Sequence, residues 1–404
     1  TLEGSQIKIP NVRVTGEGAD LNFGGTLAFS DSSPTATTNF SLTGAVNLDR
    51  LPALADGLVL FGAAAIDARL TGTFGEPKLN GRVDISGFGL STNELPIFVS
   101  NGNGFFTLAG DQIKLEKFAA DANDGRVEAD GLVKLDQLRP KEWRYNITAN
   151  NAVIAYQEIT ATINGKLTLT GTPEGQTLAG QITIPQAEYI PSIDIDNLAL
   201  GNGANLALGA FSGLGPATPQ LNIPAINLDV RVEARDSLII QSDQINTVGS
   251  AILTLTGPIN NPDPGGLITL DGGTWRFRGQ RYEIITGSLE LPPTGGSAPL
   301  LNLLAEGDSS GYRVNIGLTG PIDDLDLTLR SEPQLTRDEI LSLITTGRAE
   351  AGTLGSQDPL RSGVGTAASL ISSGLIARPT EQLLGISRFQ LDPVIRPNAN
   401  PAAR

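Results

Sequence analysis

Apolar and polar residues alternate along most of the chain before residue 333. In the clearest stretches, 228–234, 312–318 and 325–330, every second residue is apolar and polar residues or glycine stand between them. Successive side chains of a strand point to opposite faces, so this pattern predicts strands with one apolar and one polar face. Similar alternation occurs at 7–14, 21–29, 79–85, 126–135, 163–169, 180–184 and 251–256. Together these runs predict one long antiparallel sheet with one solvated face.

Recurring turn signals separate the predicted strands. The tripeptide Leu-Thr-Gly occurs at 42–44, 70–72, 169–171, 255–257 and 318–320, and we interpret each copy as a strand end. The spacing follows no fixed period, which indicates a shared turn chemistry rather than a strict repeat array. The Gly- and Pro-rich stretch 201–224 breaks the alternation and is predicted to be an irregular insertion.

The pattern becomes helical after Pro333. Thr336 and Glu339 match a capping box, an apolar stripe follows, and Gly347 is a helix stop. The further predicted elements are a helix over 358–377, a short segment over 381–384 and a strand over 386–394. The sequence therefore predicts an elongated β part over 1–332, a helical C-terminal segment over 333–385, and a terminal strand and loose tail over 386–404.

The composition removes several kinds of chemistry. The chain has no Cys and no His, so it lacks thiolate nucleophiles, the most common general base and the most common transition-metal ligand. It contains no P-loop and no Gly-x-Ser-x-Gly motif. The acidic residues of 121–125 and 323–326 stand at turns or on the polar side of strands, where solvation is the ordinary explanation. We predict neither an enzyme nor a bound metal or cofactor.

The charge and the apolar runs set further bounds. The formal net charge is −15, and scattered Lys and Arg argue against nucleic-acid binding, which requires clustered positive charge. No run of about 18 apolar residues and no signal peptide is present. The chain has no Met, not even at its first position. We therefore expect it to be a fragment of a longer protein or a processed form.

No long helix is predicted before residue 333 that could cover the apolar face of the sheet. Either the sheet closes on itself as a dry solenoid, or it curls into an open trough whose apolar inside meets a ligand. About 25 strands spaced about 4.8 Å apart would extend on the order of 120 Å. Moving a lipid tail of about 16 carbons into water costs on the order of 12 kcal/mol, so such a trough suits acyl chains.

The C-terminal third carries a more specific pattern. Its motifs, in order, are Gly272-Gly-Thr-Trp-Arg-Phe277 with Tyr282-Glu-Ile-Ile285, Pro299-Leu-Leu-Asn-Leu303, Val314-Asn-Ile-Gly-Leu-Thr-Gly-Pro321, Leu329-Arg-Ser-Glu-Pro333, Asp338-Glu-Ile-Leu-Ser-Leu343 and Leu384-Gly-Ile-Ser-Arg-Phe389. This ordered set over about 250–390 resembles the closing region of TamB-family proteins. Residues 1–249 share only the loose strand pattern of that family.

The resemblance implies a mainly β fold called a β-taco, a long U-shaped antiparallel sheet whose groove spans 1–332, with short C-terminal helices. It implies that the apolar groove carries phospholipid acyl chains between the inner and outer membranes and supports outer-membrane lipid homeostasis and biogenesis. The implied location is the periplasm of a double-membraned bacterium, with an N-terminal inner-membrane anchor outside this chain.

The resemblance also implies a partner, a TamA-like outer-membrane barrel that the C-terminal region reaches. Relatives continue past the position that corresponds to Arg404, so we expect this chain to carry the docking segment only in part.

The TamB family brings no fixed catalytic positions, so the apolar faces of the best-defined strands are the candidate groove lining. These candidates are Leu228, Val230, Val232, Leu253, Leu255, Ile268, Leu270, Trp275, Phe277, Val314, Ile316, Leu318, Leu325, Leu327 and Leu329. The competing interpretation is that the same residues pack against one another in a dry core.

Other classes stay open on the residues alone. A structural β-solenoid, such as an autotransporter or adhesin-like passenger, would have a closed cross-section and bind no lipid. A polysaccharide-active β-helix would need clustered acids with stacking aromatics, whereas the chain has two Trp and five Tyr. A chaperone-like module for outer-membrane protein assembly is a further alternative.

Overall fold

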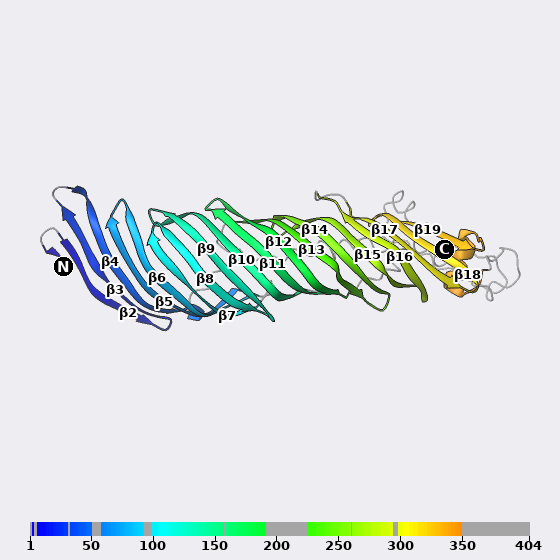
Figure 1. The fold of residues 1–404 in the computed structure, drawn as a ribbon, viewed down its shortest axis with the longest axis horizontal. Coiled ribbons are helices and arrows are strands. Elements are labelled where there is room, and N and C mark those ends of the chain that lie inside the picture. The colour runs from blue at the N-terminus through cyan, green and yellow to red at the C-terminus, as the bar shows by residue number, and fades with distance from the viewer. Residues whose placement is uncertain are drawn as a thin grey trace, which may run out of the picture.

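The computed structural model describes residues 2–3, 6–30, 33–50, 58–92, 98–156, 158–190, 225–259, 261–293 and 298–349. These residues form one sheet of 19 strands. Each strand pairs with the next one along the chain. The strands cross the long axis of the molecule obliquely, and β2 and β19 lie at opposite ends (Figure 1). The long sheet predicted from the alternation is confirmed, and it is open, as the β-taco resemblance implies.

The strands before the predicted insertion are β1 Leu2–Glu3, β2 Gln6–Gly16, β3 Ala19–Ser30, β4 Ser33–Asn47, β5 Leu58–Thr73, β6 Pro77–Thr92, β7 Val99–Gly110, β8 Gln112–Ala122, β9 Gly125–Asp136, β10 Arg139–Tyr156, β11 Ile159–Thr172 and β12 Gly175–Tyr189. Those after it are β13 Ile226–Gln241, β14 Ile245–Pro258, β15 Asp263–Phe277, β16 Gln280–Leu291, β17 Leu300–Ser309, β18 Tyr312–Pro321 and β19 Asp326–Glu332. A 3-10 turn, η1 Leu48–Arg50, follows β4, and helix α3 Arg337–Thr346 follows β19. The described strands are fewer and longer than the sequence suggests, and β10 alone has 18 residues.

One pair of neighbours departs from the predicted antiparallel order. Strands β12 and β13 run parallel, with Gln176 beside Ile226 and Tyr189 beside Ile240. The chain between two parallel neighbours must return to the edge of the sheet where the first strand began. The predicted insertion 201–224 falls in this connection and lies outside the described residues. We call the β12–β13 pair the parallel seam, and it joins two antiparallel meanders.

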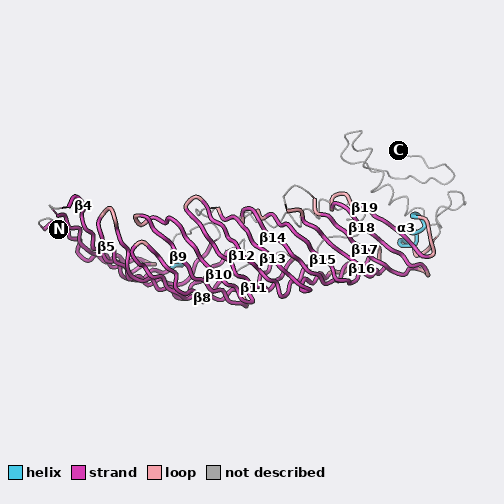
Figure 2. The backbone as a smooth tube through the Cα atoms, turned by 45° about the horizontal axis from the view of Figure 1, so that its top comes forward, coloured by secondary structure: helices cyan, strands magenta, loops and turns pink. Residues whose placement is uncertain are grey.

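A line of β-bulges crosses the middle of the sheet. Register shifts occur at matching levels of adjacent strands from β10 to β15, for example between Ala149 and Ala152 and between Ala234 and Leu238. A similar series joins β5 to β8. A bulge bends its strand, and aligned bulges curve a sheet. We call this line the crease, and it accounts for the curved sheet seen from a second side (Figure 2).

Polar side chains satisfy backbone groups that the crease leaves outside the ladder. Asn151 and Asp236 adopt positive φ of 50° and 48°, which Asn and Asp tolerate better than other residues with side chains. The Asn151 N–H donates to Asn164 Oδ1 at 2.7 Å, and the Asp236 N–H donates to Ser250 Oγ at 2.9 Å. Residues that interrupt the alternation are therefore the ones that fold the trough.

Helix α3 begins and ends at the predicted residues. The Glu339 N–H donates to Thr336 Oγ1 at 3.4 Å, and the Thr336 N–H donates to the Glu339 carboxylate at 2.7 Å. The predicted capping box is thereby confirmed. The bonds from Thr336 lower the pKa of Glu339. Gly347 ends the helix with φ of 75°, and the apolar face of α3 is buried.

The Leu-Thr-Gly signals mark strand ends with one exception. Gly72, Gly171, Gly257 and Gly320 each lie next to the last residue of a strand. Gly44 lies inside β4, so interpreting 42–44 as a strand end is wrong. Its φ is 142°, and a Cβ there would collide with the Asp20 carbonyl oxygen of the neighbouring strand. Close approach of two backbones, rather than a turn, therefore requires this glycine.

Some predicted elements fall outside the described residues. These are the helix over 358–377, the segment over 381–384 and the strand over 386–394, so the boundary between 385 and 386 stays a prediction. The part of the chain that the structure describes holds no helix long and apolar enough to cross a membrane.

Removing the side chain that supports the crease should weaken the fold. We expect Asn164→Ala to lower the free energy of unfolding by about 1 kcal/mol, because the Asn151 N–H loses its partner. Lys166→Ala, an exposed position two residues along β11, should change it by less than about 0.5 kcal/mol. Urea unfolding followed by circular dichroism measures both, and equal effects would show that the crease does not depend on this bond.

Candidate functional site

Apolar rows run across the strands on the inner face of the trough. One row joins β2 to β14, and we call it the long row. Its members, in strand order, are Val14, Leu21, Gly44, Ile66, Val83, Phe106, Leu115, Gly131, Tyr145, Leu169, Leu178, Leu228 and Gly257. Apart from buried Leu115, its side chains remain partly or largely exposed.

A second row lies beside the long row, two residues away on each shared strand except β8, where a register shift separates Leu115 from Phe118 by three. Its members are Ala19, Val46, Ala64, Ile85, Gly104, Phe118, Ala129, Ile147, Leu167, Gly180, Val230, Leu255 and Pro264. The two rows pass through the parallel seam without a break, because Leu178 stands beside Leu228 and Gly180 beside Val230. The inner face is therefore one continuous apolar strip from β3 to β14.

Glycines let large side chains lie flat on this strip. Tyr145 stands opposite Gly131, and Trp143 stands opposite Gly171. A Cβ on either glycine would collide with the ring of its partner. Each aromatic ring thus covers bare backbone on the neighbouring strand instead of standing up into the trough. This arrangement keeps the floor apolar while leaving space above it.

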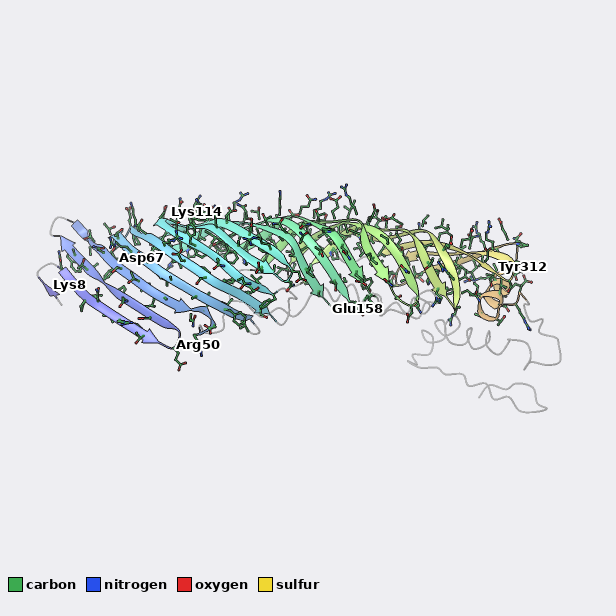
Figure 3. All side chains as sticks on the ribbon, turned by 60° about the horizontal axis from the view of Figure 1, so that its bottom comes forward. Lys8, Arg50, Asp67, Lys114, Glu158 and Tyr312 are labelled. Carbon is green, nitrogen blue, oxygen red and sulfur yellow. The ribbon has the colours of Figure 1, made fainter. Side chains whose placement is uncertain are left out.

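The outer face carries the charged residues. Arg13 pairs with Asp20 at 2.7 Å, and Lys134 pairs with Glu142 at 2.6 Å, each across neighbouring strands. The hydrogen bond from Arg13 lowers the pKa of Asp20. Lys114 projects from the same solvated side (Figure 3). These pairs are fully exposed and contribute little to stability, so the charge difference between the faces mainly sets which face meets water.

The C-terminal end of the trough is closed by α3. Ile340, Leu343 and Ile344 of the helix pack into one cluster with inner-face residues of β14 to β18. The sheet residues of this cluster are Ile245, Trp275, Phe277, Tyr282, Ile284, Leu303, Ala305, Val314, Ile316 and Leu318. Trp275, Val314 and Ile316 are 0% exposed. We call this cluster the plugged end, in contrast to the open strip.

The predicted lining residues that lie in strands share the inner face but fall into two environments. Those on the open part are Leu228, Val230, Val232, Leu253, Leu255, Ile268 and Leu270, of which Val230 and Val232 are buried and the rest partly exposed. Those inside the plugged end are Trp275, Phe277, Val314, Ile316 and Leu318, and Leu327 and Leu329 pack against it together with Leu270. Leu325 precedes β19 and is partly exposed. Their role in holding lipid stays a prediction.

The prediction missed most of the strip. No candidate came from β2 to β12, although the long row has nine apolar or aromatic side chains there. The alternation at 79–85, 126–135 and 163–169 already indicated these strands. What the sequence could not supply is the register that brings Val83, Phe106, Leu115 and Leu169 into one row.

The described part of the chain holds no group of three acidic residues arranged to bind a metal. The surface available to a ligand is the apolar inner face, which presents similar apolar positions on successive strands.

A comparison with known protein families supports the resemblance over a longer range than the C-terminal motifs. The family model of the TamB C-terminal domain matches residues 116–402. The match begins within β8, includes the parallel seam and the plugged end, and covers well over half of the chain. The chain therefore belongs to the TamB family.

Proposed function

We propose that the trough holds phospholipid acyl chains on its inner face and carries them between the inner and outer membranes. The observation that carries this proposal is the long row, an apolar line from β2 to β14 that stays partly exposed. A soluble domain ordinarily covers such a face with a second layer, and large exposed apolar surfaces mark interaction sites.

The energetics favour a sliding ligand. Each methylene that leaves the groove for water costs about 0.8 kcal/mol, so a tail is held wherever the floor is apolar. Adjacent strands present equivalent apolar positions about 4.8 Å apart. A chain that moves by one strand therefore exchanges one set of contacts for a similar set, and no step exposes the whole tail to water.

Family membership supports the setting of this function. Under the proposal the chain is a non-enzymatic module of the cell envelope, works in the periplasm, and reaches a TamA-like outer-membrane barrel through its C-terminal region. Its inner-membrane anchor would belong to a segment outside this chain. Transport of lipid requires no catalytic residue, because the bonds of the lipid do not change.

Two alternatives make different predictions. A closed structural solenoid has a dry interior, whereas the inner face between β2 and β14 is partly exposed in the described residues. A chaperone-like module would hold an apolar strand of an unfolded outer-membrane protein in the same trough. Binding of a phospholipid without such a polypeptide separates this alternative from the proposal.

A charge on the long row should remove bound lipid. We expect Leu169→Asp to reduce co-purified phospholipid about tenfold, because a carboxylate beside an acyl chain is costly to desolvate. Thr170→Asp is the matched control, since Thr170 is exposed on the opposite face of β11. Native mass spectrometry of detergent-free protein measures the bound lipid. Equal loss in both variants, or no lipid on the unaltered protein, would contradict the proposal.

The open and plugged parts should differ in their sensitivity to truncation. We expect Leu318→Ala to lower the free energy of unfolding by about 3 kcal/mol, since Leu318 is 1% exposed in a packed cluster. Leu169→Ala should cost about 1 kcal/mol, because Leu169 already meets solvent. Urea unfolding distinguishes these values, and a similar large cost at Leu169 would indicate a dry core there.

A further inference from the structure

Two polar atoms inside the plugged end have no hydrogen-bond partner among the residues that the structure describes. They are Trp275 Nε1 and the Tyr282 hydroxyl oxygen, on side chains that are 0% and 1% exposed. The two residues stand opposite each other on β15 and β16, with ring centroids 6.4 Å apart. Burial raises the pKa of Tyr282 to about 12, so the hydroxyl keeps its proton at neutral pH.

The other tryptophan shows what an ordinary arrangement looks like in this trough. Trp143 also lies flat on the inner face, and its Nε1 donates to Gln176 Oε1 at 3.1 Å. Buried donors are nearly always paired, because an unpaired one keeps its full desolvation cost. As a contribution to packing alone, Phe at either position in the plugged end would avoid that cost. Two adjacent unpaired donors therefore indicate an acceptor that is present in another state.

Helix α3 belongs to the same buried cluster as Trp275 and Tyr282. It is ten residues long and contributes three buried side chains to the cluster. The bonds around it include Ser310 Oγ to the Gly347 carbonyl oxygen at 2.8 Å and the Leu335 N–H to Ser331 Oγ at 2.9 Å. Its attachment is thus small compared with the inter-strand ladders on which it rests.

The surface beneath α3 is a direct continuation of the open strip. One inner row runs through Gly249, Leu270, Gly287, Leu303, Leu318 and Leu327. Its first members are in or beside the open part, whereas Leu303 and Leu318 lie inside the plugged end. An acyl chain that advances along the trough would meet α3 on the same kind of apolar surface that it has followed so far.

We propose that α3 is a displaceable plug, and that Trp275 and Tyr282 then donate hydrogen bonds to an acyl oxygen of the lipid that replaces it. The acyl oxygen is an ester carbonyl of a phospholipid or a carboxylate oxygen of a fatty acid, since Trp donates only and both ligands present an acceptor at the end of an apolar chain. This proposal rests on the proposed function, and it adds a site at which a sliding lipid would stop.

The two tryptophans allow each part of the trough to be followed separately. The Trp143→Phe variant has a single tryptophan, Trp275, which reports on the plugged end. The Trp275→Phe variant has a single tryptophan, Trp143, which reports on the open strip. Vesicles of phosphatidylcholine with brominated acyl chains quench a tryptophan that the chain contacts. We expect quenching of both reporters. Brominated fatty acid in a parallel titration identifies which source of the acyl oxygen reaches Trp275.

A tether on α3 tests displacement directly. The chain has no native Cys, so Ser310→Cys with Arg348→Cys gives one unique pair. Both positions are exposed, and Ser310 bonds to the residue before Arg348. We expect a short bifunctional maleimide to abolish quenching of Trp275 and to leave quenching of Trp143 unchanged. The same double variant without the crosslinker is the control.

Tyr282→Phe tests the hydrogen bonds, because it should stabilise the lipid-free protein and weaken lipid binding. It should raise the urea midpoint of the lipid-free protein, because a buried donor without a partner is removed. It should also raise the lipid concentration for half-quenching of Trp275 about fivefold to tenfold, because an acceptor loses one donor. A hydroxyl that only supports packing would instead give a lower urea midpoint on removal, and the lipid concentration for half-quenching would not rise.

The outcomes separate the two proposals. Quenching of Trp143 without quenching of Trp275 would overturn the plug and leave the lipid groove standing. Quenching of neither would overturn the groove itself. Quenching of Trp275 that persists with the crosslinked helix, or a lower urea midpoint for Tyr282→Phe, would overturn the plug by showing that lipid arrives without displacement or that the hydroxyl already has a partner.

Discussion

A single sheet with one apolar face must shield that face without the help of a second layer. In this protein the crease provides that shielding. Its aligned bulges bend each strand, so the two ends of the strand approach each other over the inner face. Bulging leaves backbone groups unpaired, and short polar side chains such as Asn164 and Ser250 accept their hydrogen bonds. The curvature, and with it the trough, therefore depends on a small number of polar residues rather than on the apolar ones that line it.

The same inner face serves two purposes along its length. Between β2 and β14 the rows remain partly exposed, and glycines opposite aromatic rings keep the floor low. Beginning at Ile245 of β14 and Trp275 of β15, the inner face enters a packed cluster that α3 completes. The sequence pattern of the strands is alike in both parts. What differs is the presence of a helix with three apolar side chains on one face, so a short C-terminal element decides whether equivalent strands form a surface or a core.

Much of the fold could be predicted from the alternation of apolar and polar residues and from the helix-capping residues. Leu228, Val230 and Val232 do share a face, and Thr336, Glu339 and Gly347 do bound a helix. The crease was hidden, because a bulge shifts the alternation by one residue and resembles noise in the pattern. The parallel seam was hidden as well, since periodicity specifies the face of a strand but not its neighbour.

The environment of the candidate lining could be predicted only in part. Trp275 and Phe277 belong to the inner face, as their alternation with Arg276 indicates. Nothing near them in sequence shows that Ile340 and Leu343 will cover them, because that contact links segments more than sixty residues apart. The long row was missed for the same reason. The sequence of each strand indicates its own apolar positions. A row across many strands depends on the register of every pair, which the sequence pattern does not specify.

The parallel seam also has a consequence for how the molecule assembles. Within each meander, consecutive strands are separated by ten residues or fewer, so their pairing needs little loop closure and can spread from one hairpin to the next. Pairing of Gln176 with Ile226 instead closes a loop through the whole connection between β12 and β13. As synthesis proceeds from the N-terminus, β1 to β12 can pair before β13 has left the ribosome. The two meanders can therefore form independently of each other. The continuous inner face forms only when β12 pairs with β13.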